Sequence, residues 1–301
     1  MLDASAGSER LFADHYVNLR APHASDAIAA QLRETGVVTL DGLTTRQTVL
    51  ASASRLMQIT PHPHGAPDGL TLIHDTGSYA HRAGFAGLGN GELLAHTERS
   101  GTPKPPRLIL LVCLQPASTG GETLLADGLD VHARLVSQNR AAAIALCQPR
   151  TAYFGAGTGH ASQVFTIQAD GRISIRLRQD GLARWSPIVQ PYLPALRSAV
   201  TASQCRLTLQ AGQGYLLDNH RWLHARVSPG TAGSCAPWES PASRFRTASR
   251  PTRQPACCPR RERPSDAPQL RGGDSHDRGQ PARAGGLQGR QPHRSHRPGH
   301  G

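Results

Sequence analysis

The sequence predicts a mainly β fold with flanking helices, of the barrel or jelly-roll kind. Two observations predict it: many short apolar runs of strand length alternate with turn signals, and only a few segments space their apolar residues as a helix does. This pattern continues to residue 228 and then stops. We therefore expect a globular domain over residues 1–228 and a tail of different character over residues 229–301.

The N-terminal part of the domain predicts two helices around one strand. Ser25 is expected to cap a helix over 27–33, a strand follows at 37–40, and Thr44 or Thr45 is expected to begin a second helix. The second helix is predicted because its apolar residues recur at helical spacing: Val49, Leu50, Ala53, Leu56 and Met57.

The rest of the domain reads mostly as strands. Alternation on both sides of Asp170-Gly171 predicts a β-hairpin at that turn. The expected strands are 70–73, 92–98, 107–115, 122–126, 164–168, 172–178, 206–210 and 214–224, and the expected helices are 130–146 and 192–203.

The net charge of +12 lies mostly in the tail. The chain has 33 basic and 21 acidic residues. Thirteen arginines but only five acidic residues lie in 229–301, which gives that segment a charge of +8 and leaves +4 on residues 1–228. A nearly neutral domain does not favour a nucleic acid or an anionic membrane as its partner.

Other features exclude further classes. The longest apolar run, 108–114, is too short to span a bilayer, and the start of the chain lacks the features of a secretory signal. The six cysteines form no CxxC pair and no regular spacing, so neither a zinc site nor a disulfide framework is indicated. We therefore expect a cytoplasmic protein that does not insert into a membrane.

The tail is rich in Arg, Pro, Gly, Ala and Ser and contains no Ile, Val, Met or Tyr. Such a composition cannot bury enough apolar surface to offset the entropy of ordering, so disorder is expected. Three explanations are open: an arginine-rich arm that binds RNA, a solvated linker, or an out-of-frame reading of a GC-rich gene. The ratio of 32 Arg to one Lys favours the third.

His96-Thr97-Glu98 is the segment that most strongly indicates chemistry. On a strand, residues two apart point to the same face, so His96 and Glu98 could bind one metal ion. A second histidine, His224, ends the apolar run that starts at Gly214. Two histidines and one carboxylate are the ligands of the facial triad of non-haem Fe(II) sites. The plainer alternative is a surface strand whose two polar residues face water.

The chain resembles the TauD/TfdA-like branch of the Fe(II)- and 2-oxoglutarate-dependent oxygenases, in the clavaminate-synthase-like superfamily. Four motifs in the same order carry the resemblance: Leu94–Glu98, Pro106–Ala117, Gly120–Gly128 and Asp218–Arg226. It covers about residues 30–228. It implies a double-stranded β-helix, a cupin-like jelly roll, and an enzyme that uses Fe(II), 2-oxoglutarate and O2.

Carried over residue by residue, the resemblance implies that His96, Glu98 and His224 bind iron. It also implies that the Thr123 hydroxyl contacts a carboxylate of 2-oxoglutarate. Glu98 stands where many relatives have Asp. A glutamate carries the same charge and the same donor atoms as an aspartate. The implied reaction hydroxylates a small-molecule substrate, which the sequence does not identify, with release of succinate and CO2. Arg226 is expected to be structural.

The pattern breaks after Arg226. In the family, an arginine about a dozen residues after the distal histidine pairs with 2-oxoglutarate, but the window Cys235–Glu239 has none, and Arg244 and Arg246 are the nearest candidates. We therefore expect the last strand of the domain to be missing and hypothesise a frameshift.

Two alternative functions follow from this break: a catalytically impaired or dead cupin-like protein, and an RNA-associated protein that uses the basic tail. The sequence makes no prediction of the oligomeric state.

Two weaker signals are expected to be structural. His62 and His64 lie beside prolines and are read as part of a polar turn. Arg176, Arg178 and Arg184 are read as a solvated face.

Overall fold

The computed structural model describes residues 4–74, 89, 91–117, 120–227, 238–240 and 242–244. The chain separates into two compact units, Met1–Pro259 and Arg260–Gly301, and all described residues belong to the first. Most of the tail predicted from residue 229 onward lies outside the described residues, so its disorder stays a prediction.

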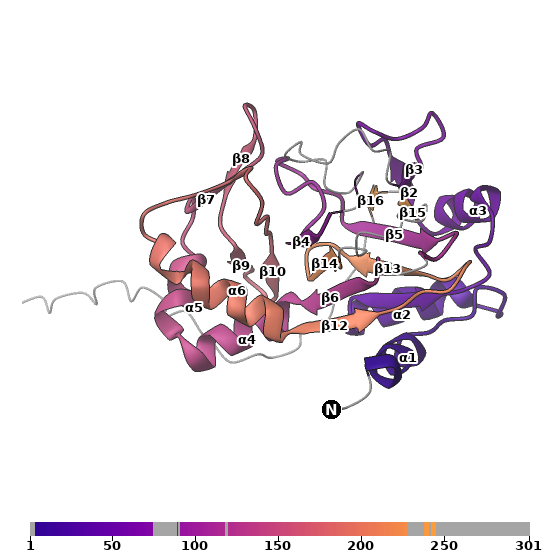
Figure 1. Ribbon diagram of the computed structural model, residues 1–301, viewed down its shortest axis with the longest axis horizontal. Coiled ribbons are helices and arrows are strands. Elements are labelled where there is room, and N and C mark those ends of the chain that lie inside the picture. Colours follow the sequence, from indigo (N-terminus) through magenta and orange to yellow (C-terminus); the bar gives the residue numbers. More distant parts are fainter. Residues whose placement is uncertain are drawn as a thin grey trace, which may run out of the picture. The chain divides into compact units, whose positions relative to one another are not determined.

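The elements of the first unit follow one another in this order (Figure 1): α1 (Ala4–Asp14), α2 (Ala24–Glu34), β1 (Val37–Leu40), α3 (Arg46–Leu56), β2 (Gln58–Thr60), β3 (Thr71–Ile73), β4 (Leu93–His96), β5 (Leu108–Cys113), β6 (Thr123–Asp127), α4 (Gly128–Gln138), α5 (Arg140–Leu146), β7 (Ala152–Phe154), β8 (His160–Ser162), β9 (Phe165–Ile167), β10 (Ile173–Ile175), β11 (Ala183–Trp185), the 3-10 helix η2 (Gln190–Tyr192), α6 (Leu193–Ala202), β12 (Gln204–Leu207), β13 (Gly214–Asp218), β14 (Trp222–Arg226), β15 (Trp238–Ser240) and β16 (Ala242–Arg244).

Two antiparallel sheets carry most of the strands. The larger sheet has seven, with the path β1-β13-β5-β15-β3, and β16 pairs with both β2 and β5. The smaller sheet has four, in the order β12-β6-β14-β4. In addition, β11, β7 and β8 form a three-stranded sheet and β9 pairs with β10. The prediction of a fold with many strands and flanking helices is confirmed at this level, and the paired strands are antiparallel.

Successive side chains of a strand point to opposite faces of its sheet, and here they belong to different hydrophobic cores. The membership of each core therefore shows which layers lie next to each other. On β13, Leu217 shares a core with Leu125 of β6, whereas Leu216 packs with α2 and α3. On β14, Leu223 packs with α4, α5 and α6. The two sheets therefore face each other across one core, and helices cover their outer faces, as Figure 1 shows. Because both faces are covered, β1, β13 and β14 are buried along their whole length.

Side-chain caps decide where helices begin. Thr45 and Thr48 form a reciprocal capping box at the start of α3, which confirms that predicted start. The helix predicted over 130–146 is in fact two helices, because the Asn139 side chain accepts from the Ala142 N–H at 3.0 Å and begins α5. The predicted Ser25 cap is wrong, since α2 already begins at Ala24.

The strand predicted over 214–224 is two strands joined by a turn. The Arg221 N–H donates to the Asp218 carbonyl at 2.9 Å, and the His220 N–H donates to Asp218 Oδ1, also at 2.9 Å. A short acidic side chain that bonds its own backbone two residues on is typical of a tight turn. The reversal lets β14 leave the larger sheet and enter the smaller one.

The predicted absence of a closing strand is not confirmed. β15 and β16 lie in the segment expected to be disordered, and both pair with β5 on the edge that β13 leaves open. These six residues are the described part of the segment that the composition predicts to be disordered. The composition argument considered side-chain packing alone, whereas main-chain pairing to an open strand edge needs no particular side chain.

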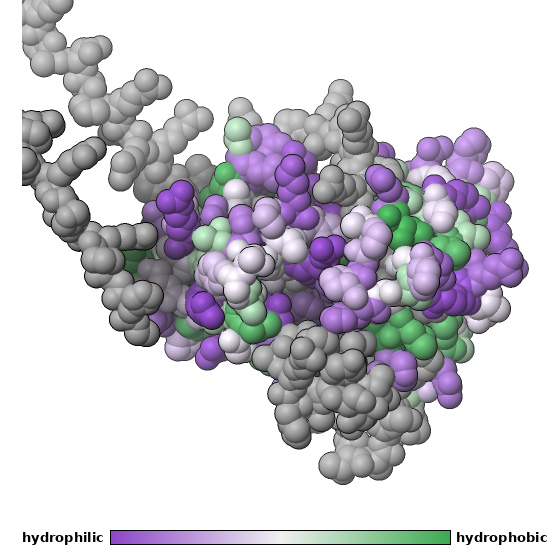
Figure 2. Space-filling view, turned by 90° about the horizontal axis from the view of Figure 1, so that it is seen from above, coloured by the Kyte–Doolittle hydropathy of each residue, from purple (hydrophilic) through white to green (hydrophobic). Residues whose placement is uncertain are grey.

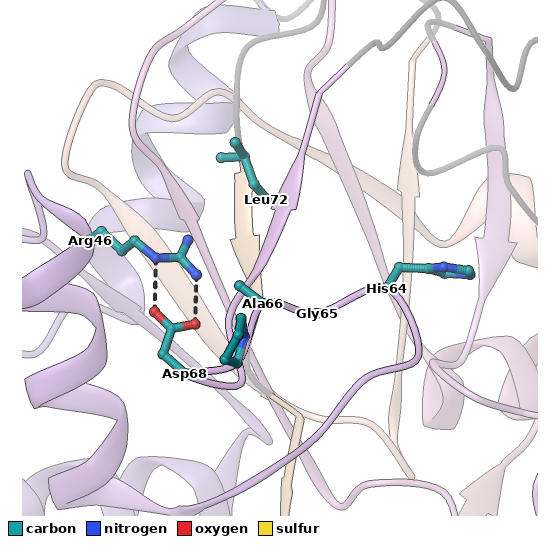
Figure 3. Close-up of a pocket in the computed structure, with 7 residues that line it drawn as sticks. Arg46, His64, Gly65, Ala66, Asp68 and Leu72 are labelled. Atoms are coloured by element: carbon teal, nitrogen blue, oxygen red, sulfur yellow. Dashed lines mark hydrogen bonds and ion pairs between the residues drawn. The ribbon is translucent and has the colours of Figure 1, made fainter.

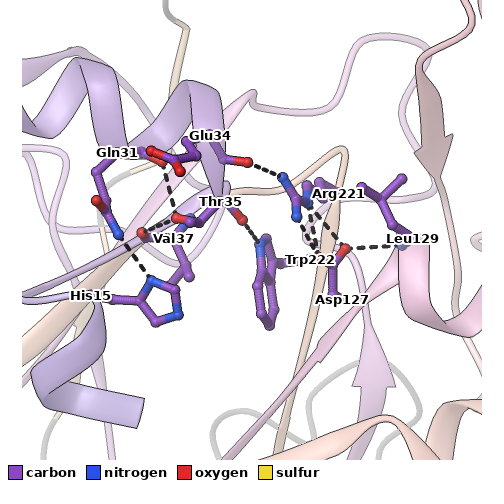
Figure 4. Close-up of polar contacts among 9 residues, drawn as sticks. All are labelled: His15, Gln31, Glu34, Thr35, Val37, Asp127, Leu129, Arg221 and Trp222. Carbon is purple, nitrogen blue, oxygen red and sulfur yellow. Dashed lines mark hydrogen bonds and ion pairs between the residues drawn. The ribbon is translucent and has the colours of Figure 1, made fainter. Parts of the chain in front are cut away.

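A polar network holds the end of α2 against the start of β14 (Figure 4). Arg221 donates to Asp127 Oδ2 at 2.6 Å and to the Glu34 carbonyl at 2.8 Å. The Trp222 indole donates to the Thr35 carbonyl at 2.8 Å. Asp127 also accepts from a main-chain N–H at 2.9 Å, as the N-cap of α4. One carboxylate thus connects three elements.

Hydrophilic residues dominate the described surface of the face seen in Figure 2, and apolar residues occur there in separate small areas. Within the described part of the chain, no helix is both long and apolar enough to cross a bilayer.

We expect Asp127→Ala to lower the free energy of unfolding by about 3 kcal/mol, because the change removes a helix cap and leaves a partly buried guanidinium without its carboxylate. Urea denaturation measures the effect. As the control, Arg172→Ala breaks the pair with Asp170, in which both side chains are 38% exposed, and should leave the midpoint near that of the wild type. Equal midpoints for the two variants would contradict this account.

Candidate metal centre

The structure brings together the three residues that the sequence singled out. His96, Glu98 and His224 each offer one ligand atom, and these atoms all lie within 4.8 Å of one another. The two imidazole rings are 4.2 Å apart between centroids, at an angle of 50°. Two nitrogens and one carboxylate oxygen this close together are a donor set suited to a transition metal.

Strand pairing places the two histidines side by side. His224 lies in the middle of β14 and is the direct cross-strand partner of His96 at the end of β4. On its other side, His224 is opposite Leu125 of β6. Direct partners in antiparallel strands project from the same face. Both imidazoles therefore lie on the face of the smaller sheet that turns toward the larger sheet, where Leu125 contributes to the shared core.

Glu98 reaches the site by a different route from the one predicted. We expected His96 and Glu98 on one strand, but β4 ends at His96. The buried Asn219 side chain holds the Glu98 backbone instead: its Oδ1 accepts from the Glu98 N–H at 2.7 Å, and its Nδ2 donates to the Glu98 carbonyl at 3.1 Å. Asn219 Nδ2 also donates to the Pro106 carbonyl at 2.9 Å.

Thr97, which lies between His96 and Glu98 in the sequence, is held by its own hydrogen bonds to Leu177. Its N–H donates to the Leu177 carbonyl at 2.9 Å, and its hydroxyl accepts from the Leu177 N–H at 3.2 Å. Thr97 is buried. The backbone of both residues after β4 is therefore fixed although it is no longer in a sheet.

The hydrogen bonds of the two histidines fit a metal ligand role. His96 Nδ1 lies 2.9 Å from the Leu94 carbonyl, which can only accept, so this nitrogen carries the hydrogen and Nε2 keeps its lone pair for a metal. His224 Nδ1 is buried and has no hydrogen-bond partner among the described residues. Burying an imidazole nitrogen without a hydrogen-bond partner costs free energy, and coordination of a metal by this ring would explain why the histidine is buried here.

The electrostatics keep the donors in their metal-binding forms. Burial alone would raise the pKa of Glu98, but the contact with His62 and the nearby His96 and His224 lower it to about 2. Burial lowers the pKa of His224 to about 3, with a further contribution from His96. Burial also lowers the pKa of His96, against the opposing influence of Glu98. The carboxylate is thus ionised and both imidazoles are neutral near pH 7.

Thr123 lies on the same face of the sheet as the histidines. It is the first residue of β6, two residues before Leu125, and is paired with Arg226 of β14. It is buried, and its side chain hydrogen-bonds with the Tyr215 phenol. The structure therefore places Thr123 on the sheet face that carries His224, on the neighbouring strand β6.

Several arginines near the site hold the chain in place. Arg226 is buried and donates to the carbonyls of Gly89 and Gly91 at 2.5 and 3.0 Å, as its expected structural role requires. Arg176 donates to the Thr102 carbonyl at 3.0 Å, and Arg178 pairs with Asp180 at 2.6 Å. The prediction of a solvated arginine face is wrong for these two, because their guanidinium groups bind main-chain and carboxylate acceptors.

Two residues of the site were missed by the sequence analysis. Asn219 was read as part of a continuous strand, although a polar Asp-Asn pair between two apolar runs is itself a turn signal. His62 was read as part of a polar turn, but its Nε2 lies 3.6 Å from Glu98 Oε1. No local pattern indicates that contact, since it joins segments 36 residues apart in the sequence.

A cavity of about 620 Å³ is lined in part by the loop that follows His62. Figure 3 shows Arg46 and Asp68 paired at this cavity, with the His64 side chain directed away from them. None of the three candidate metal ligands lines it. This cavity is therefore separate from the candidate metal centre.

Comparison with known proteins agrees with this geometry. A model of the family described as "Taurine catabolism dioxygenase TauD, TfdA family" matches residues 3–234. Human gamma-butyrobetaine dioxygenase is 26% identical over 183 residues, which are 52% of this chain and 47% of the human protein; the Pongo abelii protein matches to the same extent. The chain thus spans about half the length of the curated relatives it matches.

Solved structures share the fold at low sequence identity. An asparagine oxygenase in complex with Fe(II), 2S,3S-3-hydroxyasparagine and succinate has a TM-score of 0.60 and 16% identity, over 80% of this chain and 83% of that one. OrfP in complex with Fe, succinate and (3S)-hydroxy-L-Arg has a TM-score of 0.58 and 14% identity, over 80% of this chain and 92% of the OrfP chain. PvcB, an Fe, alpha-ketoglutarate dependent oxygenase, has a TM-score of 0.58 and 13% identity, over 76% of this chain and 82% of the PvcB chain. With the family model matching most of its length, the chain belongs to the TauD/TfdA family.

Proposed function

We propose that this chain is an Fe(II)- and 2-oxoglutarate-dependent oxygenase that hydroxylates a small molecule. The observation that carries the proposal is the convergence of His96, Glu98 and His224 within 4.8 Å in a member of this family. We further propose that the two facing sheets form a double-stranded β-helix around the site. When bound, Fe(II) and 2-oxoglutarate supply the oxidising chemistry, with O2 as the oxidant and succinate and CO2 as products.

Each residue has a distinct part in this proposal. His96, Glu98 and His224 would hold Fe(II), and a set of two histidines and one carboxylate would leave room for 2-oxoglutarate and O2. Asn219 fixes the backbone of Glu98 and so the direction of its side chain. The Thr123 hydroxyl, on the same face, donates to a carboxylate oxygen of 2-oxoglutarate.

The arginine that pairs with 2-oxoglutarate in this family has no counterpart in the window Cys235–Glu239. The family match ends at residue 234, close to where the composition changes. We infer that residues 229–301 read out of frame and that the in-frame sequence carries this arginine on an apolar strand. Reading the other two frames of the gene tests the inference, and the absence of such a strand from both would refute it.

The proposed function is tested by succinate formation. With Fe(II), 2-oxoglutarate and O2 added, the wild-type chain should convert 2-oxoglutarate to succinate, and His96→Ala should abolish the conversion because one of three metal ligands is lost.

Thr123→Val should instead raise the KM for 2-oxoglutarate about tenfold, since one hydrogen bond to a carboxylate is worth roughly 1.5 kcal/mol. Succinate is measured by chromatography.

The matched control is His23→Asn. His23 precedes α2 with a positive φ of 59°, which Asn tolerates, and its side chain is exposed. This variant should retain wild-type turnover. Succinate formation that survives in His96→Ala would refute the metal assignment, and its absence from the wild type would support a catalytically dead protein instead.

Metal binding should depend little on pH between 8 and 6. Metal ligands must be deprotonated, and two imidazoles with the ordinary pKa of 6.5 would weaken binding more than about tenfold over this range. Because burial lowers the pKa of His96 and lowers that of His224 to about 3, protons compete only at lower pH. We expect a change of less than about fourfold in the Kd for Co(II), measured by calorimetry. A tenfold or larger change would contradict the assigned environment.

A further inference from the structure

The loop between β2 and β3 brings a fourth titratable side chain to the metal centre. His62 Nε2 lies 3.6 Å from Glu98 Oε1. The distance is slightly longer than a hydrogen bond, so a small rotation of either side chain would close it. The two side chains are 24% and 27% exposed, which places the contact at the rim of the site.

The loop itself determines which nitrogen of His62 carries the hydrogen. The His64 main-chain N–H donates to His62 Nδ1 at 3.2 Å, and a main-chain N–H is always a donor. Nδ1 therefore accepts, and the hydrogen is on Nε2, the nitrogen that faces Glu98. The imidazole presents a donor to the carboxylate, which leaves it no lone pair with which to bind the metal.

The loop is also fixed in position. The Gly65 N–H donates to the His62 carbonyl at 2.9 Å, which closes a tight turn around the histidine. Arg99, the residue after Glu98, donates to the Pro61 carbonyl at 3.4 Å. The residue before His62 and the residue after Glu98 are thus joined by a hydrogen bond next to the contact in sequence.

A glutamate needs such a contact more than an aspartate does. Glu98 has one more rotatable bond than Asp would have, so its carboxylate can adopt more orientations and loses more entropy when one of them is fixed. Asn219 holds only its backbone. A donor that engages one carboxylate oxygen would fix the remaining rotation and direct the other oxygen to the metal.

We propose that His62 is a positioning residue of the metal centre: its Nε2–H holds Oε1 of Glu98 and so presents the second carboxylate oxygen to the metal. The proposal rests on the proposed function, since it assigns Glu98 as a ligand. The lowered pKa of Glu98, to which the contact with His62 contributes, agrees with a donor at this oxygen.

The test measures Co(II) binding by calorimetry and the visible absorption spectrum of the bound Co(II), with the full chain. His62→Leu removes the donor and should weaken Co(II) binding about 10-fold to 100-fold, as is usual when a contact to a metal ligand is lost, and should shift the spectrum. His62→Gln retains an N–H at similar reach and should stay within about threefold of the wild type.

His23→Asn is again the control, because it replaces an exposed imidazole and leaves the segment that holds His62 unchanged. It should bind Co(II) as the wild type does. Melting of the metal-free variants shows whether a loss of binding comes from unfolding.

Wild-type affinity and spectrum in His62→Leu would overturn the proposal while leaving the proposed function intact. Equal losses in His62→Leu and His62→Gln would also overturn it, because packing and not the N–H would then be responsible. A wild-type chain that binds no Co(II) would refute both the proposal and the proposed function.

Discussion

The candidate metal centre depends on one buried amide. The Asn219 side chain binds both the N–H and the carbonyl of Glu98, and so connects the turn after β13 to the chain that leaves β4. Because β4 ends at His96, no sheet hydrogen bond positions Glu98, and this amide takes over that task. The two histidines are placed by strand pairing alone, whereas the carboxylate is placed by a side chain 121 residues away in the sequence.

The stacking of the layers explains why the site lies where it does. Helices cover the outer faces of both sheets, so the face between the sheets is the most shielded from water. His224 projects there from a strand that is buried along its length. The Arg221–Asp127 pair joins the start of β14 to the end of β6 and so supports the register in which His224 lies opposite Leu125.

Local pattern was enough to predict many of the strands, the α3 cap and the three residues that converge at the candidate centre, because strand alternation, capping chemistry and metal-donor types are properties of neighbouring residues. It was not enough for the route by which Glu98 reaches the site. Asn219 and His62 act across long sequence distances, and a single sequence contains no signal of such contacts. The pairing of β15 and β16 with β5 was missed for a related reason, since main-chain pairing leaves little trace in composition.

The most direct test of this account is the Kd for Co(II) of Asn219→Ala, in which all three ligands are intact, measured on protein whose circular dichroism shows that it is folded. If the amide holds Glu98 in place, binding should weaken to about the level of a Glu98→Gln variant. Wild-type affinity in folded Asn219→Ala would contradict the central claim, because Glu98 would then reach the metal without the contact on which the site is said to depend.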